Sequence, residues 1–106
     1  MFARHVALRL IPNSVAEFTR TFDTEVLPKL RKQTGFQDGI TFAMFGDTEV
    51  IAISLWDTKE HAEAYNNTGY PEVLKSLSKV LDGTPTVRVS DVISSTIHKT
   101  ATVAAA

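Results

Sequence analysis

The residue types best suited to acid–base chemistry in this chain are its three histidines, because an unperturbed imidazole has a pKa of about 6.5. His61 follows a predicted strand and stands in the first turn of a predicted helix. This position makes it our candidate for a general base. The alternative is a solvated helix residue with no specific role, as most exposed polar side chains are.

Tyrosine hydroxyls and aromatic walls are the second source of chemistry. Tyr65 and Tyr70 flank the sequence NNTGYP, which interrupts a helical pattern and begins with Asn66. A break in a helix frees backbone groups and suits the entrance of a binding site, although it also fits a simple kink. Side chains predicted to line a pocket are Trp56, Tyr70, Phe42 and Asn66. The aromatic members of this set fit a hydrophobic core equally well.

Two arginines lie inside predicted strands. A cation on a strand that is buried on both faces needs a carboxylate or an anionic ligand, because an unpaired buried charge is costly. Arg88 is therefore a candidate for holding a substrate oxygen, and Arg9 is a candidate pocket residue. The structural alternative is that Asp91 pairs with Arg9 across the sheet.

Metal binding is not expected. His5 and His98 are predicted near the ends of neighbouring strands, where they could approach each other at the edge of a sheet. A zinc site needs three or four ligands, and the chain has no cysteine to supply another. The absence of cysteine also excludes disulfides and a cysteine nucleophile, and it fits a reducing compartment.

The composition is that of a single globular domain. The chain has 106 residues, 43% of them hydrophobic and 22% charged, and a net charge of −1. Nucleic acid is an unexpected partner, since the positive charges are scattered among acids. The N-terminal segment lacks the layout of a signal peptide, and no window approaches the ~20 apolar residues of a membrane helix. We therefore expect a cytoplasmic protein without a membrane partner.

The hydrophobic period alternates between strand and helix along the chain. Residues 2–11 read as a strand, and a helix begins at Ser14, bends near Pro28 and ends at Gly35. Strands are predicted over 39–46 and 49–56, followed by a helix that starts at Asp57 or Thr58 and restarts near Pro71. A last strand covers 86–93. This order predicts an α+β ferredoxin-like βαββαβ subunit, with a four-stranded antiparallel sheet whose first and third strands are central.

Two helices on one face would leave the other face of this sheet bare. Strand residues of both parities are apolar, Ile51 and Ile53 against Val50 and Trp56 in the third strand. An exposed apolar face of this size exceeds what soluble monomers usually tolerate. We therefore predict a homodimer that packs through its sheet faces.

Two passages carry a resemblance to a known family: VLPKLRKQTGFQDG, residues 26–39, and SLWDTKEHAEAYNNTGYPEVLKSL, residues 54–77. They resemble the antibiotic biosynthesis monooxygenase family of the dimeric α+β barrel superfamily. The resemblance implies a dimeric barrel and a ligand cavity between sheet and helices in each subunit. The likeness covers about residues 3–93, and we predict a single domain over residues 1–98 with a C-terminal tail over 99–106.

The resemblance also bears on activity. Haem-degrading members use an Asn on the first strand, and a Trp and a later His on the second helix; this chain lacks that Asn and has Tyr65 about where the Trp would fall. Haem degradation is therefore disfavoured, and the resemblance implies a cofactor-independent monooxygenase acting on a hydrophobic phenolic or carbonyl compound, with His61, Tyr65 and Arg88 as catalytic candidates. The alternatives are an isomerase of the same superfamily, a non-enzymatic dimer that binds a small ligand, and an accessory protein with a filled interior.

Overall fold

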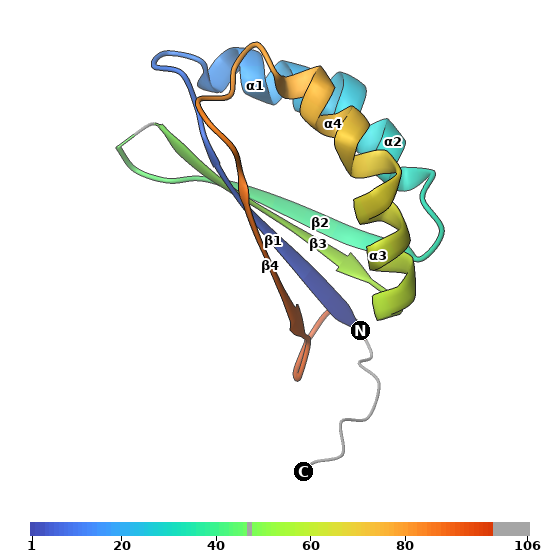
Figure 1. Ribbon diagram of the computed structural model, residues 1–106. Coiled ribbons are helices and arrows are strands. Elements are labelled where there is room, and N and C mark those ends of the chain that lie inside the picture. The colour runs from blue at the N-terminus through green and yellow to red at the C-terminus, as the bar shows by residue number, and fades with distance from the viewer. Residues whose placement is uncertain (47, 99–106) are drawn as a thin grey trace.

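The computed structural model describes residues 1–46 and 48–98, and the predicted tail over 99–106 lies outside these residues. The elements follow the order β1 (Phe2–Arg9), α1 (Val15–Thr21), the π-helix η1 (Phe22–Val26), α2 (Leu27–Arg31), β2 (Phe36–Ala43), β3 (Glu49–Trp56), α3 (Lys59–Asn67), α4 (Gly69–Leu77) and β4 (Thr86–Asp91). All helices lie on one face of a four-stranded sheet (Figure 1). The predicted α+β ferredoxin-like fold is confirmed.

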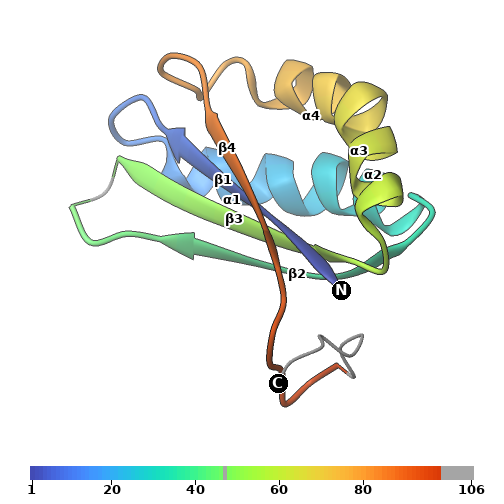
Figure 2. The same ribbon diagram turned by 60° about the horizontal axis from the view of Figure 1, so that its bottom comes forward.

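The strand order is β2-β3-β1-β4, and every pair of neighbours is antiparallel. Strands β1 and β3 are therefore central, as predicted. Figure 2 shows β1 and β4 crossing in front of α1, with the long hairpin of β2 and β3 at one side of the sheet. None of the helices in the described ranges combines the length and apolar character needed to cross a membrane.

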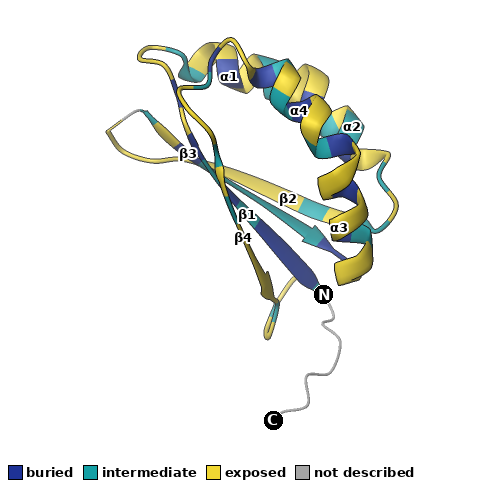
Figure 3. Cartoon of the chain, viewed as in Figure 1, coloured by how far each residue is buried: buried dark blue, intermediate teal, exposed yellow. Residues whose placement is uncertain are grey.

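The alternation along β1 decides which side chains face the helices. Phe2, Val6 and Leu8 are buried, whereas His5 and Arg9 lie on the opposite parity. Since Phe2 pairs with Trp56 and Leu8 with Val50, the even-numbered residues of β3 share the covered face. These strand residues and the inner sides of the helices form the core, and Figure 3 marks β1 and parts of the helices as buried.

The first helical segment, formed by α1, η1 and α2, is irregular near Pro28, where the sequence predicts a bend. The backbone N–H of Leu27 donates to the carbonyl of Phe22, five residues earlier, so the helix widens into a π-turn. Pro28 follows directly and has no N–H to donate to the carbonyl of Thr24. The irregularity predicted near Pro28 is therefore this π-turn, next to the position where the proline removes a backbone donor.

The uncovered face is apolar over only half its width. By the strand register it carries Ile51, Ile53 and Leu55 from β3 with Ile40 and Phe42 from β2. The β1 and β4 half carries Ala3, His5, Ala7, Arg9, Thr86, Arg88 and Ser90. The large apolar side chains of β1 point toward the helices, so among its apolar residues only Ala3 and Ala7 lie on this face.

Several predicted boundaries are corrected. Strand β2 begins at Phe36, three residues before the predicted start, and contains a register shift between Phe36 and Asp38. Thr58, and not Asp57, caps α3, because its hydroxyl accepts the backbone N–H of His61 at 3.2 Å. The helix break falls at Thr68, and α4 begins at Gly69, before Pro71. Strand β4 ends at Asp91.

Two predicted pairings are wrong. Asp91 pairs with Phe2 at the opposite end of β1 from Arg9, so it cannot neutralise that arginine. His5 and His98 have different partners: His5 Nε2 lies 2.9 Å from Ser90 Oγ, and His98 Nε2 lies 2.9 Å from Asp38 Oδ2 on β2. The segment after β4 therefore crosses to the other edge of the sheet.

Candidate functional site

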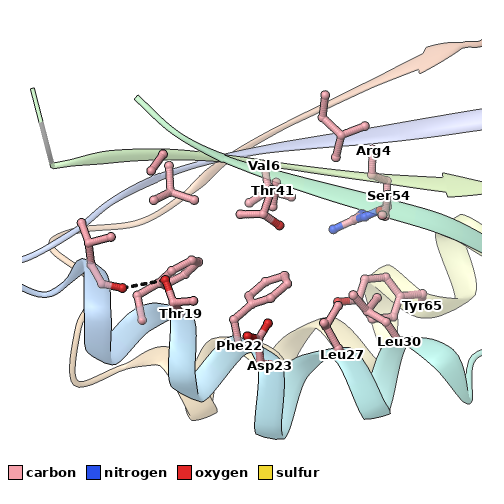
Figure 4. A pocket seen from close by; sticks show the side chains of 17 residues that line it. Arg4, Val6, Thr19, Phe22, Asp23, Leu27, Leu30, Thr41, Ser54 and Tyr65 are labelled. Atoms are coloured by element: carbon pink, nitrogen blue, oxygen red, sulfur yellow. Dashed lines mark hydrogen bonds between the residues drawn. The ribbon is translucent and has the colours of Figure 1, made fainter. Parts of the chain in front are cut away.

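A cavity of about 310 Å³ lies between the first helical segment and the sheet. Figure 4 shows its helical wall below and its strand wall above, with the side chains of both pointing inward. Most of the lining is apolar. The lining residues are Arg4, Val6, Val15, Phe18, Thr19, Phe22, Asp23, Leu27, Leu30, Gly39, Thr41, Ala43, Val50, Ala52, Ile53, Ser54 and Tyr65.

Arg4 is the charged group at one end of this cavity. It shares the parity of Phe2 and Val6, so β1 directs its side chain toward the helices, and only 2% of the residue is exposed. Its Nη1 donates to Asn66 Oδ1 on α3 at 2.8 Å. Figure 4 shows the guanidinium end projecting into the cavity beside Ser54. The sheet thus presents a cation to an apolar chamber.

Two nitrogens of this guanidinium have no partner. Nε and Nη2 of Arg4 are buried and form no hydrogen bond with any residue of the described ranges. The guanidinium carbon lies 5.2 Å from the ring centroid of Tyr65 and 4.7 Å from that of Tyr70, so both rings make cation–π contacts. These contacts offset part of the cost of burial, but they do not satisfy the two N–H groups.

The electrostatic balance of this site is positive. Burial lowers the pKa of Arg4, whereas the same burial raises the pKa of Tyr65 to about 12 and also raises the pKa of Tyr70. Both phenols are therefore neutral near pH 7 and carry no charge that could compensate Arg4. An anionic oxygen placed beside Arg4 would be attracted by the uncompensated charge of the guanidinium. It could also accept a hydrogen bond from the neutral phenol of Tyr65.

The ring of Tyr65 is held by its neighbours on three elements. It stacks on Trp56 with ring centroids 5.0 Å apart, and Phe36 packs edge-on against the same indole at 5.6 Å. Gly69 leaves room for the ring, because a Cβ there would lie 2.8 Å from Tyr65 Cδ1. The helix break predicted as a binding feature therefore accommodates the ring that contacts Arg4.

Asp23 is the one carboxylate among the described lining residues. It lies on η1 and is exposed, so it stands at the rim and not beside Arg4. Ser54 and Thr41 add hydroxyls from the sheet, and Ser54 Oγ already accepts the indole N–H of Trp56 at 2.9 Å. The cavity thus has a buried cationic end and an acidic rim.

The structure brings some of the predicted site residues together. Tyr65 lines the cavity, Tyr70 contacts both Arg4 and the Tyr65 ring, and Asn66 binds Arg4. Trp56 is fully buried behind Tyr65 as a support. Asn66, Tyr65 and Tyr70 contact the guanidinium of Arg4, and Trp56 supports the ring of Tyr65.

The other predicted site residues lie elsewhere. Phe42, Arg9 and Arg88 are on the uncovered face of the sheet, away from the cavity. His61 is outside the cavity at the start of α3, where its Nδ1 lies 2.7 Å from Asp57 Oδ1. Gly35, at a φ of 86°, packs closely against this pair. The geometry around His61 is that of a link between α3 and the start of β2, and its role as a base stays a prediction.

Arg4 and Asp23 are the residues that sequence reasoning missed. Arg4 lies on the parity of Val6 and Leu8, and that alternation alone indicates an inward side chain. Asp23 gave no comparable signal, because the π-turn rotates it relative to a regular helix.

The raised pKa of Tyr65 predicts a stability change at alkaline pH. Because the folded-state pKa of about 12 lies above the unfolded value of about 10, the contribution of Tyr65 to the free energy of unfolding is constant below about pH 10. It is lost as the pH rises from there through the folded pKa. Tyr65→Phe keeps the ring and removes the hydroxyl, so its stability should decline less over this range in urea unfolding experiments. Parallel declines in both proteins would contradict this assignment.

Comparison with solved structures places this geometry in a known fold. A Nitrosomonas europaea protein of unknown function is 15% identical, with a TM-score of 0.76 over 92% of this chain and 94% of the other. The Streptomyces coelicolor monooxygenase ActVA-Orf6, in complex with nanaomycin D, is 18% identical, with a TM-score of 0.71 over 84% of each chain. SnoaB, a cofactor-independent oxygenase of Streptomyces nogalater, is 13% identical, with a TM-score of 0.73 over 92% and 97%.

The fold is that of the antibiotic biosynthesis monooxygenases. The resemblance drawn from residues 26–39 and 54–77 is thereby confirmed at the level of the fold. No protein-family model matches the sequence, and no curated protein matches it either.

Proposed function

We propose that this protein is a cofactor-independent monooxygenase that oxidises a hydrophobic phenolic or carbonyl compound in the cavity beneath the first helix. The observation that carries the proposal is Arg4, a buried cation with two unpartnered nitrogens at the end of an apolar chamber. Proteins of the same fold include a monooxygenase with a bound ligand and a cofactor-independent oxygenase, which supports this choice of chemistry.

The reaction balances without an external reductant. Loss of one proton from an activated CH₂ group of the substrate gives an anion whose charge is delocalised onto a neighbouring oxygen. That anion reduces O₂, a C–O bond forms, and the proton returns from the base to the outer oxygen to give a hydroperoxide on the same carbon. The hydroperoxide loses water, which breaks its O–O bond and the remaining C–H bond and leaves a C=O group. One oxygen atom enters the product and the other enters water.

The chain's residues would act on the first of these steps. Arg4 stabilises the substrate oxyanion by charge, and Tyr65, neutral because its pKa is raised, can donate a hydrogen bond to it. The apolar walls contributed by Phe18, Phe22 and Leu30 exclude water and strengthen both interactions. Asp23 is the lining carboxylate and our candidate to accept the proton.

Oxygen uptake tests this proposal directly. Purified protein is incubated with anthrone-like compounds and quinols in an oxygen electrode, and the products are analysed by mass spectrometry. The wild-type protein should consume one O₂ for each substrate converted, at a rate well above that of buffer. Asp23→Asn should slow the reaction by about 10²-fold if Asp23 is the base, whereas His61→Ala should react at the wild-type rate.

The alternatives give different results in the same experiment. An isomerase would convert a carbonyl compound without oxygen uptake, and a binding protein would retain its ligand unchanged. Either outcome would overturn the proposed oxygenation. A slow His61→Ala variant with a normal Asp23→Asn variant would return the role of base to His61. The cavity of about 310 Å³ argues against an accessory protein whose interior is filled by its own side chains.

We further propose that two copies associate through the apolar half of the uncovered sheet face. Ile40 and Phe42 are 52% and 47% exposed there, and half-buried isoleucines of β3 lie beside them. A second copy packed on this face would remove these side chains from water.

A further inference from the structure

The two unpartnered nitrogens of Arg4 form one edge of its guanidinium. Nη1 is occupied by Asn66 Oδ1, which leaves Nε and Nη2. The N–H bonds of Nε and Nη2 that share this edge run nearly parallel, and their spacing matches the two oxygens of a carboxylate. We propose that the cavity ligand is an apolar monocarboxylate whose carboxylate binds this edge of Arg4. This inference deepens the proposed function, because it assigns an anchoring group to the substrate of the same cavity. The carboxylate takes the Nε and Nη2 edge of Arg4, and the oxyanion that forms during the reaction takes its hydrogen bond from Tyr65.

The contacts of Arg4 fix the orientation of this edge. Asn66 on α3 holds Nη1, while the rings of Tyr65 and Tyr70 contact the guanidinium carbon. A flexible surface arginine loses side-chain entropy when it binds an anion, whereas this one is already held. The site is therefore preorganised for a planar, two-oxygen acceptor.

The electrostatic balance favours a charged acceptor over a neutral one. Arg4 has already lost its contact with water, so an incoming carboxylate does not have to desolvate it. Within the described residues its hydrogen-bonding and aromatic partners are an amide and two phenols, none of which is anionic near pH 7. A neutral carbonyl or hydroxyl would satisfy the N–H groups but leave the charge uncompensated.

The remainder of the cavity indicates an apolar body with a single charge. At the packing density of protein interiors, about 310 Å³ holds roughly 230 Å³ of ligand volume, the size of about two or three fused rings. The walls that such a body would contact include Val6, Phe18 and Val50. Asp23 at the rim would repel a second carboxylate, so a monocarboxylate fits better than a dicarboxylate.

Isothermal titration calorimetry with a matched ligand pair tests the inference. The ligands are 1-naphthoate and its neutral, nearly isosteric amide 1-naphthamide, both at pH 7, with naphthalene-1,4-dicarboxylate as a third ligand. Wild-type protein should bind 1-naphthoate at least about 30-fold more tightly than the amide, and the dicarboxylate more weakly than the monocarboxylate. Equal or tighter binding of the amide would overturn the inference.

Variants test which residue causes the preference for 1-naphthoate over 1-naphthamide. Arg4→Met should bind acid and amide with equal affinity, and Arg4→Lys, which keeps the charge without the fork, should retain only part of the preference. Arg88→Met is the matched control, because Arg88 is a strand arginine on the uncovered face, and it should keep the wild-type preference. Loss of the preference in Arg88→Met, or its persistence in a folded Arg4→Met, would place the carboxylate site elsewhere and overturn the inference.

The oxygenase proposal and the carboxylate-site proposal can be contradicted independently of each other. If the wild-type protein prefers the acid but no compound of the panel supports oxygen uptake, the carboxylate site stands and the oxygenase proposal fails. If neutral phenols are oxidised while acid and amide bind equally, the oxygenase proposal stands and the carboxylate anchor is wrong.

Discussion

Arg4→Met is expected to lower the oxygenation rate by about 10²- to 10³-fold, because it removes the cation that holds the anionic group of the substrate in the cavity. The same substitution should leave the protein as stable as the wild type, or raise the free energy of unfolding by up to about 2 kcal/mol. A residue that matters for activity and costs stability is characteristic of a functional site and not of a structural ion pair. Rates come from oxygen uptake, and stability comes from urea unfolding.

The expected change in the free energy of unfolding is the sum of opposing contributions. Methionine loses the hydrogen bond to Asn66, worth about 1 kcal/mol, and two cation–π contacts of roughly 1 kcal/mol each. It also removes a buried charge and two unsatisfied N–H groups, whose burial costs about 1–3 kcal/mol per group. Methionine is flexible and apolar, so it can fill much of the vacated space. The gains and losses nearly cancel, with a small balance toward stabilisation.

Arg88→Met is again the control, since it removes a strand arginine that does not line the cavity. It should change the oxygenation rate by less than about twofold. A loss of more than about 2 kcal/mol in Arg4→Met, with an unchanged rate in the fraction that stays folded, would make Arg4 a structural residue and remove the basis of the proposed function.

The fold can be predicted from this sequence because the local patterns of secondary structure agree with the overall topology. The apolar run of β3, the proline before Leu30 and the break after Asn67 all appear as apolar stretches or as turn residues in the sequence. The start of β2 is not predicted correctly from the sequence. Gln37 lies in an irregular step between Phe36 and Asp38, so the alternation is interrupted where the strand begins.

The residues of the candidate site are predicted only in part from the sequence, for a different reason. Residue type suggests His61 and the tyrosines, and parity suggests an inward Arg4. Whether a buried polar group finds a partner depends on residues distant in sequence, and Asn66 is 62 positions from Arg4. His61 looked suitable by type, but its ring turns to Asp57 at the helix start, outside the cavity. The hydrogen bond from His61 is the main cause that lowers the pKa of Asp57.

The uncovered sheet face gives the second large expected effect. Ile51→Lys should convert a dimeric wild-type protein into a folded monomer. Ile51 is half-buried in the single chain, between Ala7 and Phe42 on the neighbouring strands. A lysine there can reach water in the monomer, so the cost to folding is small. In a face-to-face dimer the same ammonium group would be buried without a partner, which costs about 3–5 kcal/mol and weakens association by at least about 100-fold.

Sedimentation velocity at micromolar concentration measures this change, with circular dichroism to show that the variant is folded. Ala64→Lys is the matched control, because it adds the same charge at an exposed position of α3 in the helical layer. It should sediment as the wild-type protein does. A wild-type protein that is monomeric under these conditions would remove the proposed dimer, and a dimeric Ile51→Lys would move the interface off the β2 and β3 half of the face. Since Ile51 does not line the cavity, its variant also tests whether one subunit suffices for ligand binding.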